Sequence, residues 1–450
     1  MRRVVVAGIL AALLIAGCAT PDGRDAAGPQ PTQPALNMWG AGLADYYETP
    51  DIALTRSSDE RRADVAPPGD PAYARFDQVM LSIMERYDVP AGSLALMHDG
   101  RLLYASGYGY TKPDGTGATD TDKMFRMASV TKPIARALVS LQVEQGLYEW
   151  DDPVFCVPPE PDPDCRLPLT PHPYWPVVDE RVADITVRML VDHTAGWDRS
   201  MRPDKLEIIQ EMQDLFDIQG MPGLWHAGLY LMGTHLANDP GRTFSYCSVC
   251  YMLVGLVAEA ATGVDLQALY DAYLFRPLEV EGDIELGKMP LADRNPREPF
   301  YISGVEVENV YDPDETVDAA DGEYHFDITS SAGALIGTPE AVAAVYEAYP
   351  VGLADLHLLG PLPLGIDPYD GMYDAHLAAG GQYGTNSLSV WAEDIQTNTG
   401  IIQYVVLFNA DYIRPNSGGC LGSAVGVDCV GWRELQNELF LMLAEKAREG

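Results

Sequence analysis

The stretch FRMASVTKPIARALVSLQVEQG, Phe125–Gly146, places a hydroxyl and an amine at a helical spacing. Ser129 and Lys132 are three residues apart, and residues with that spacing share one face of a helix. The apolar residues around them recur at helical intervals, which predicts a helix that begins near Ser129. A serine becomes a nucleophile when a base removes its proton, and a lysine can be that base only if its pKa is lowered. The alternative is that Lys132 is an ordinary surface residue.

The composition is that of a globular protein of one large or two ordinary domains. The chain has 450 residues, of which 47% are hydrophobic and 21% are charged. Its formal net charge is −37, and the sequence contains no basic stripe of the kind that follows a nucleic-acid backbone. We therefore expect no nucleic-acid partner, and we interpret the acidity as a self-repelling, soluble surface.

The N-terminus has the pattern of an export signal. Two arginines, Arg2 and Arg3, precede the apolar run VVVAGILAALLIAG, which is too short for a membrane-spanning helix. The tetrapeptide IAGC, which ends at Cys18, resembles the lipobox of bacterial lipoproteins. This resemblance implies removal of residues 1–17, acylation of Cys18 and a lipid anchor in the bacterial cell envelope, at the outer membrane or the periplasmic face. The alternative is a plain signal peptide with a chance cysteine.

Cys18 leaves six further cysteines, an even number that suits disulfides in an exported protein. Two pairs bracket short loops, and we expect local bridges Cys156–Cys165 and Cys420–Cys429. In YCSVC, Cys247 and Cys250 form a C-x-x-C pattern. Because further metal ligands at a matching spacing are missing from the sequence, we expect a structural bridge or two buried thiols there.

Secondary-structure signals at the two ends of the chain are similar. The segment DPAYARFDQVMLSIMERYD, 70–88, has apolar residues at helical spacing, and 91–110 reads as two strands joined at His98-Asp99-Gly100. Segment 385–411 reads as a second strand pair with a turn near Asn398-Thr399-Gly400. An amphipathic helix with Leu435, Leu439 and Met442 on one side closes the chain. We therefore predict one antiparallel sheet built from both ends of the chain, with helices outside it.

Several motifs in order along residues 75–445 resemble the serine beta-lactamase-like superfamily, which includes class C beta-lactamases, D-alanyl-D-alanine carboxypeptidases and esterases. They are VPAGSLALMHDGRLLYASGYGY, MASVTKPIARAL, GLYEWDDPV, ITVRMLVDHTAGW, PGRTFSYCSVCYMLVGLVAEAATG and TSSAGALIGTPEAV. The resemblance implies an α+β fold, with an antiparallel sheet flanked by N- and C-terminal helices and an all-helical lobe. After a flexible tether over 18–70, the domain would cover 71–450. Its α/β lobe would take 71–128 and 325–450, and its helical lobe 129–324.

The same resemblance assigns the catalytic residues. Ser129 takes the place of the acylated nucleophile, Lys132 that of the assisting base, and Tyr246 that of a phenol that passes the proton to the leaving group. The alternative for Tyr246 is a buried core tyrosine. Ser248 replaces the usual asparagine two residues after the tyrosine, so it would reach the lysine or the substrate carbonyl less well.

The third family motif departs further from the pattern. Its best match is AAGGQYGTNSLSVW, which places Ala378 where a lysine or histidine normally binds the substrate carboxylate. His376 lies on the same strand face, about 7 Å earlier, and is either a partial substitute or an ordinary polar residue. An alanine cannot bind a carboxylate, and an arginine near the site would have to replace the missing cation, so we expect weak recognition of β-lactams and D-Ala-D-Ala termini and favour neutral esters or amides as substrates.

The backbone part of the site is expected to be intact. The N–H groups of Ser129 and Gly381 would hold the oxyanion, and Gly380 would let the substrate approach the chain closely. His193, in HTAG, is expected to shape a turn rather than to take part in catalysis. The remaining histidines share no metal-ligand spacing, so we expect no metal and no cofactor.

These features predict a serine hydrolase that acts through an acyl-enzyme on a small ester, amide or peptide-like substrate. No G-x-S-x-G elbow, P-loop or dinucleotide fingerprint points to another class of enzyme. One alternative is an inactive, penicillin-binding-like envelope module, which the replacements at Ser248 and Ala378 favour. Another is a beta-lactamase or D-Ala-D-Ala carboxypeptidase.

Overall fold

The computed structural model describes residues 56–157, 164–167, 169, 171–349, 373–394, 400–410 and 430–449. The predicted signal segment, Cys18 and most of the tether lie outside these residues, as does the expected pair Cys420–Cys429. The described chain begins with a short helix, α1 (Ser58–Arg61), and a 3-10 turn, η2 (Pro71–Tyr73). The predictions for the signal segment and its lipid anchor therefore remain predictions.

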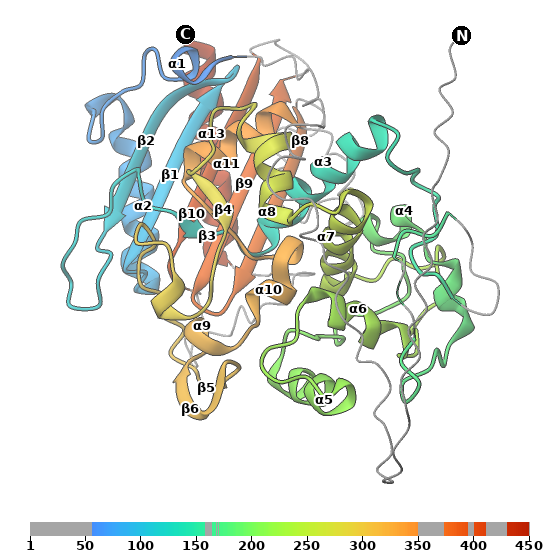
Figure 1. Ribbon diagram of the computed structural model, residues 1–450. Coiled ribbons are helices and arrows are strands. Elements are labelled where there is room, and N and C mark those ends of the chain that lie inside the picture. The colour runs from blue at the N-terminus through green and yellow to red at the C-terminus, as the bar shows by residue number, and fades with distance from the viewer. Residues whose placement is uncertain are drawn as a thin grey trace, which may run out of the picture.

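A five-stranded antiparallel sheet contains strands from both ends of the chain. Its order is β2-β1-β10-β9-β8. The strands are β1 (Ala91–His98), β2 (Arg101–Gly109), β8 (Tyr373–Gln382), β9 (Thr385–Asp394) and β10 (Ile401–Phe408). β1 pairs with β10 at the centre of this sheet, so the N-terminal and C-terminal strands meet there (Figure 1). This arrangement confirms the sheet predicted from the two strand pairs.

The first predicted hairpin turn lies where the sequence placed it. Between β1 and β2, Asp99 and Gly100 have φ angles of 46° and 69°. Two consecutive positive φ values are typical of the type I′ turn that Asp-Gly favours, because its twist matches that of the strands. The second turn joins β9 to β10. Of its predicted residues only Gly400 is described, and its φ is 91°.

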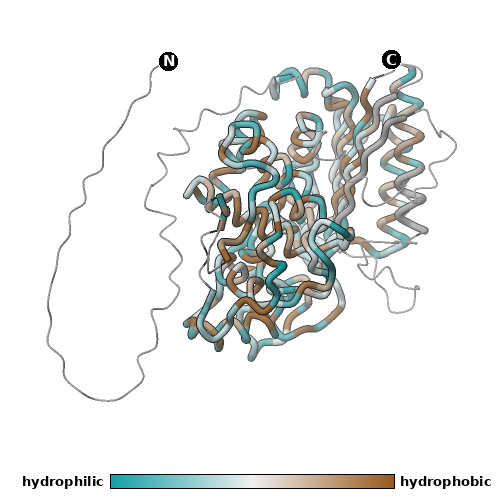
Figure 2. The backbone as a smooth tube through the Cα atoms, turned by 90° about the vertical axis from the view of Figure 1, so that its right-hand side faces the viewer, coloured by the Kyte–Doolittle hydropathy of each residue, from teal (hydrophilic) through white to brown (hydrophobic). Residues whose placement is uncertain are grey.

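Two helices cover the outer face of the sheet. α2 (Ala74–Tyr87) and α13 (Val430–Glu449) pack together against it, and Figure 2 shows the sheet between these helices and the rest of the described chain. On α2, the predicted apolar stripe is buried, with Met80 fully inaccessible. On α13, Leu439 and Met442 are buried as expected. Each such side chain contributes roughly 1.5–3 kcal/mol through burial.

The opposite face of the sheet packs on α11 (Pro339–Ala348), and the helical part of the chain lies beside it (Figure 1). The central helix there is α7 (Ser248–Thr262), which is almost entirely buried and contacts α3, α4 and α6. The helices of this part are α3 (Thr131–Glu144), α4 (Val187–Val191), α5 (Leu206–Phe216), α6 (Leu224–Met232) and α8 (Leu266–Tyr270), the last followed by a π-helical turn, η5 (Asp271–Phe275).

The segment 129–324, expected to be helical throughout, also contains short strands. β4 (Ile284–Leu286) joins β3 (Phe125–Arg126) and β7 (Leu335–Gly337) in a small sheet of order β3-β7-β4. β5 (Glu306–Asn309) and β6 (Asp312–Asp318) form a separate exposed hairpin. Two short helices, α9 (Ala319–Gly322) and α10 (Phe326–Thr329), follow.

No single helix among the described residues is long and apolar enough to cross a membrane. The pair formed by Ser248–Thr262 and Leu266–Phe275 meets the length and composition criteria together, but it is bent by 84°.

Candidate active site

Ser129 lies in a 3-10 turn, η3 (Ala128–Val130), that leads directly into α3. Ala128 has a φ of 45°, in the left-handed region that costs energy for a residue with a side chain. The residue before it, Met127, is held from two sides. Its N–H donates to Leu335 O in β7 (2.9 Å), and its carbonyl accepts from Ser387 Oγ in β9 (2.5 Å). The turn that presents Ser129 is therefore fixed by both sheets.

Lys132 is buried next to the serine. Its side chain comes from the first turn of α3 and is only 2% exposed. Its Nζ donates to Ser129 Oγ at 3.1 Å and to the carbonyl oxygen of Ala332 at 2.5 Å. The alternative of an ordinary surface lysine is therefore wrong.

The environment of Lys132 favours its neutral form. Burial is the largest cause, and it lowers the pKa of the ammonium below the ordinary value of 10.5. The neighbouring Tyr246 opposes this shift, whereas the positive charges of Arg202 and Arg199 add to it. A lysine whose pKa is lowered in this way accepts a proton from a hydroxyl at a lower pH than an ordinary lysine can.

Tyr246 reaches the serine from a distant part of the chain. Its phenol oxygen lies 2.7 Å from Ser129 Oγ, within hydrogen-bond distance. Both neighbours of Tyr246 are held by His193: the N–H of Ser245 donates to the His193 carbonyl (2.9 Å), and the N–H of Cys247 donates to His193 Nδ1 (3.2 Å). The His193 ring also stacks on the tyrosine ring, with 4.7 Å between centroids. Tyr246 is therefore part of the site and not merely a core residue.

The pKa of Tyr246 is lowered from its ordinary value of 10.0. Burial is the largest single influence and would raise it, but the charge and hydrogen bond of Lys132, the hydrogen bond with Ser129 and the charge of Arg199 together outweigh burial. The pKa values of both groups lie below their ordinary values and each depends on the charge of the other, so a proton can move among the serine, the tyrosine and the lysine.

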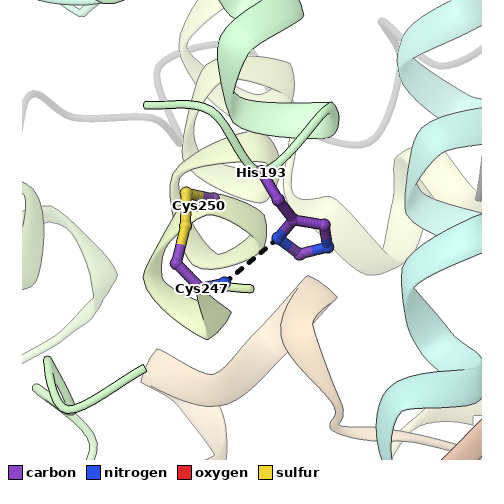
Figure 3. Close-up of side chains that lie close together, drawn as sticks. All are labelled: His193, Cys247 and Cys250. Atoms are coloured by element: carbon purple, nitrogen blue, oxygen red, sulfur yellow. Dashed lines mark hydrogen bonds between the residues drawn. A yellow bond between two sulfur atoms is a disulfide. The ribbon is translucent and has the colours of Figure 1, made fainter. Parts of the chain in front are cut away.

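A disulfide closes the segment behind Tyr246. The structure joins Cys247 to Cys250 at the start of α7 and Cys156 to Cys165, as predicted. Figure 3 shows the imidazole of His193 beside the Cys247–Cys250 bridge, with Nδ1 facing the Cys247 backbone. Among the residues that the structure describes, His193, Cys247 and Cys250 place their potential ligand atoms close enough together to hold a metal ion. The sulfur atoms of Cys247 and Cys250 are bonded to each other, and His193 Nδ1 already accepts the N–H of Cys247. We therefore do not assign a metal there.

His193 itself shapes a turn, as expected. Its φ is 56° and its side chain is 1% exposed. Burial, with a contribution from the charge on Lys132, lowers its pKa to about 3. The ring is therefore neutral at physiological pH and holds the tyrosine without adding charge to the site.

Among the residues expected to bind the substrate, Ser248 is closest in sequence to a reactive residue, Tyr246. It is the first residue of α7, two positions after Tyr246, and is half-buried. Ala378 is in β8 with its side chain buried in the core, at 4% exposure. His376 is in the same strand, where its backbone pairs with Trp391, and its side chain lies outside the described residues.

The two glycines predicted to lie at the oxyanion position are at the end of β8. Gly380 pairs with Ser387, the residue whose hydroxyl binds the Met127 carbonyl, and Gly381 pairs with Asn386. β8 packs against the 3-10 turn that carries Ser129. The backbone of Gly381 is exposed, so a substrate can reach it. The structure therefore places this strand end beside the nucleophile turn.

Two features of the site were not predicted. The carbonyl of Ala332 binds Lys132, but a backbone acceptor leaves no residue-type signal in a sequence. Arg199 places its guanidinium carbon 5.5 Å from the centroid of the Tyr246 ring. A signal for this second feature existed, because three cations occur within seven residues in an acidic chain: Arg199, Arg202 and Lys205.

Comparisons with known proteins agree with this architecture. The family model "Beta-lactamase" matches residues 76–394. Two solved structures share the fold. A class C beta-lactamase has a TM-score of 0.54 and 15% identity, over 82% of this chain and 96% of that chain. D-amino acid amidase from Ochrobactrum anthropi SV3 has a TM-score of 0.51 and 18% identity, over 84% and 98%.

Curated relatives match over shorter stretches. Esterase EstB from Burkholderia gladioli is 30% identical over 246 residues, 52% of this chain and 57% of the relative. A putative fimbrial assembly protein, FimD of Dichelobacter nodosus, is 26% identical over 196 residues, 44% of each. The chain thus spans about half the length of the curated relatives it matches. The family model covers well over half of the chain, and the protein therefore belongs to the beta-lactamase family.

Proposed function

We propose that the protein is a serine hydrolase that cleaves esters or amides through an acyl-serine intermediate. The observation that carries this proposal is the convergence of three groups: Ser129 Oγ lies 2.7 Å from the Tyr246 phenol and 3.1 Å from Lys132 Nζ. A hydroxyl that contacts both a phenol and a buried amine has a path for its proton, which is the condition for nucleophilic attack.

In the first half-reaction, Ser129 Oγ attacks the carbonyl carbon and its proton passes to the Lys132–Tyr246 pair. The bond to the leaving group then breaks, and Tyr246 returns the proton to the leaving oxygen or nitrogen. In the second half-reaction, the same pair takes a proton from water, whose oxygen attacks the acyl-serine; the bond between the acyl carbon and Ser129 Oγ then breaks, the pair returns the proton to Oγ, and the acid is released. The lowered pKa values of both groups match this alternation between accepting and donating a proton.

In this proposal, backbone N–H groups stabilise the negative charge that develops on the tetrahedral intermediate. The N–H groups of Ser129 and Gly381 would donate to the oxygen of the tetrahedral intermediate. Gly381 is suited to this because the strand that carries it ends beside the Ser129 turn with its backbone exposed. Loss of one such donor typically costs about 3 kcal/mol in the barrier.

Relatives with an ester or amide substrate in their names favour the same reaction class. These relatives include Esterase EstB and, at 23% identity, D-aminopeptidase from Gluconobacter oxydans (strain 621H). The buried, apolar side chain of Ala378 favours an esterase over a beta-lactamase or D-Ala-D-Ala carboxypeptidase, because it offers no cation from β8. Rapid turnover of nitrocefin would contradict this interpretation of Ala378.

A fluorophosphonate probe tests the proposal directly, because it forms a covalent bond only with an activated serine. We expect the intact mass of the full chain to rise by one probe adduct, and the Ser129→Ala variant to remain unlabelled. Ser106 serves as a control because it is a buried serine in β2, so Ser106→Ala should label like the wild type. A folded wild-type protein that takes up no probe would instead favour the binding module motivated by Ser248 and Ala378.

We also retain the proposal of a lipid anchor, which rests on the sequence IAGC alone. Metabolic labelling with a palmitate analogue in a bacterial host should modify the wild-type chain but not Cys18→Ala. Equal labelling of both would contradict the anchor and leave the hydrolase proposal untouched.

A further inference from the structure

Asp204 is a fully buried carboxylate that joins the loop before α5 to both ends of α10. Its two carboxylate oxygens accept from Arg202 at 2.9 and 2.7 Å. The oxygen Oδ2 also accepts from the Thr329 hydroxyl at 3.0 Å, and that hydroxyl bridges to the carbonyl of His325 at 3.1 Å. The Asp204 backbone carbonyl accepts from the N–H of His325 at 2.9 Å. The first and last turns of this short helix are therefore held by one residue.

The carboxylate of Asp204 is ionised in the folded protein. Burial is the largest influence on its pKa and would raise it, but the charge and hydrogen bonds of Arg202, with the hydrogen bond of Thr329, together outweigh burial and lower the pKa. Asp204 and Arg202 thus form an ion pair in which the carboxylate is fully buried and the guanidinium is partly exposed. Removal of the anion would leave the arginine charge without compensation.

The C-terminal end of α10 leads directly into a strained turn. Thr329 is followed by the 3-10 turn η7 (Ser330–Ala332), and Ser330 has a φ of 32° and a ψ of −117°. A residue with a side chain keeps such a conformation only where the surrounding contacts fix it. The hydrogen bond from Thr329 to the buried carboxylate fixes one side of the turn. On the other side, the hydroxyls of Ser331 and Tyr270 are hydrogen-bonded at 2.8 Å.

The last residue of this turn binds the amine of the proposed base. The carbonyl of Ala332 accepts from Lys132 Nζ at 2.5 Å, and Nζ lies 3.1 Å from Ser129 Oγ. A neutral amine has two N–H groups and one lone pair, so donation to the carbonyl sets the direction in which the lone pair points. The position of the Ala332 carbonyl therefore decides how well that lone pair faces the serine hydroxyl.

We propose that Asp204 is a positioning residue for the base Lys132, on which it acts through the turn that carries the Ala332 carbonyl. The inference rests on the proposed hydrolase function, because it adds a residue to the same proton pathway. The contact of Asp204 with Thr329 holds the turn in place. Its negative charge also offsets that of Arg202, which lowers the pKa of Lys132.

Other charged and titratable groups face these two residues. Among the described residues, those that act on Lys132 or lie beside it are His193, Arg199, Arg202, Tyr246 and Tyr251. Those within the electrostatic reach of Asp204 are Arg202, Lys205, Tyr311, Tyr324 and His325. Burial lowers the pKa values of both histidines below 6.5, so the rings are neutral above neutral pH. We therefore assign the alkaline transition in the reactivity of Ser129 to the Lys132–Tyr246 pair.

The first test measures the rate at which a fluorophosphonate labels Ser129, as a function of pH, in Asp204→Asn. This change keeps the shape of the side chain and removes its charge. We expect the midpoint of the transition to move down by roughly 0.5–1 pH unit, because the charge of Arg202 is no longer offset. Arg202→Gln should move the midpoint up, because that charge is then absent. Asp179→Asn is the matched control, since Asp179 also accepts from an arginine two residues away, Arg181, at 2.9 and 2.7 Å, and its midpoint should equal that of the wild type.

The second test changes the contact with the turn and leaves the charges in place. Thr329→Val keeps the shape of the side chain and removes the hydroxyl. We expect kcat/KM for a p-nitrophenyl ester to fall roughly 10-fold, because a small displacement of a catalytic group is costly. Thr329→Ser keeps the hydroxyl and should recover most of the activity. This pair of variants decides the question if Asp204→Asn does not fold.

The possible outcomes separate this inference from the proposed function. If Asp204→Asn keeps the wild-type midpoint and Thr329→Val keeps the wild-type kcat/KM, the inference is overturned and the hydrolase proposal stands. Variants that lose only stability in urea, with midpoint and kcat/KM unchanged, give Asp204 a purely structural role and overturn the inference as well. If the wild type takes up no fluorophosphonate, the hydrolase proposal fails and the inference falls with it.

Discussion

Two buried cations flank the nucleophile turn at equal distances in the sequence, and they have opposite surroundings. Arg126 lies three residues before Ser129, and Lys132 lies three residues after it. Arg126 is completely buried beside the carboxylate of Glu298, with 3.8 Å between Nε and Oε2, and its guanidinium carbon lies 4.0 Å from the centroid of the Tyr301 ring. The observed partners of Lys132 are a serine hydroxyl and a backbone carbonyl.

This difference shows how the partner decides what a buried cation does. A guanidinium beside a carboxylate stays charged and holds two segments together, because an arginine does not lose its proton in a protein. An ammonium that donates to neutral groups lacks a counter-charge of that kind, so burial lowers its pKa and lets it exchange a proton. We therefore expect activity to depend on Lys132 and stability to depend on Arg126.

The largest expected effect follows from Lys132→Met, which keeps the length of the side chain but removes the amine. We expect kcat/KM for a p-nitrophenyl ester to fall by about 10³-fold or more, because general-base catalysis contributes 10²- to 10⁴-fold. Unfolding in urea should show a native state at least as stable as the wild type, since a buried amine is replaced by an apolar group. A variant that keeps a tenth of the activity would contradict the role of Lys132 as a base.

Arg126→Met should lower the stability of the protein rather than its activity. We expect the free energy of unfolding to fall by about 3–5 kcal/mol, because the carboxylate of Glu298 is then buried without its cation. Chemical denaturation of the single variant, of Glu298→Gln and of the double variant measures the coupling. The double variant should recover much of the loss. If both single variants are as stable as the wild type, the two residues are not a structural pair.

Tyr246→Phe is expected to have a smaller effect on activity than removal of the lysine. The ring would still stack on His193, but the hydroxyl that contacts Ser129 would be lost. A loss of roughly 100-fold in kcat for an amide, whose leaving nitrogen needs a proton, is the expected result. The loss should be smaller for a p-nitrophenyl ester, whose leaving group departs as an anion. Equal losses for both substrates would mean that the phenol does not protonate the leaving group.

The effect that is smallest at neutral pH concerns the stability contribution of His193. Its pKa is lowered to about 3 in the folded state, so below its ordinary pKa of 6.5 the unfolded chain binds a proton that the folded chain does not. Its contribution to stability is therefore complete above pH 6.5 and is lost as the pH falls toward 3, with a slope of at most about 1.4 kcal/mol per pH unit. His193→Asn should flatten the urea-unfolding profile in this window. Parallel profiles for His193→Asn and the wild type would contradict a buried, neutral ring.

Much of the fold follows from periodic patterns in the sequence. The alternation and turn residues of the two strand pairs predict the five-stranded sheet except for β8, and the stripe on α2 predicts one of its covering helices. The hairpin of β5 and β6 gave no such signal, because its residues are polar and mostly exposed, so hydrophobic alternation is absent. Backbone pairing forms those strands, together with a side-chain hydrogen bond of 2.8 Å from Asn309 to Glu315.

The site was predictable only where side chains of a particular type are required. Ser129, Lys132 and Tyr246 were recognisable from spacing and from family motifs, and the structure brings them together. The left-handed backbone at Ala128 could not be read from the sequence, since alanine is not a residue that favours it. The Ala332 carbonyl was equally hidden, because its contact with Lys132 depends on tertiary structure.

The most direct test of this account is the rate at which a fluorophosphonate labels Ser129 as a function of pH. The buried Lys132 must be neutral to take the serine proton, and its pKa lies below the ordinary value of 10.5. The labelling rate should therefore rise with pH through a transition whose midpoint lies below pH 10.5, and Lys132→Met should lack this transition. A midpoint at pH 10.5 or above in the folded wild type would mean that the amine keeps an ordinary pKa, and would contradict the proposed proton pathway.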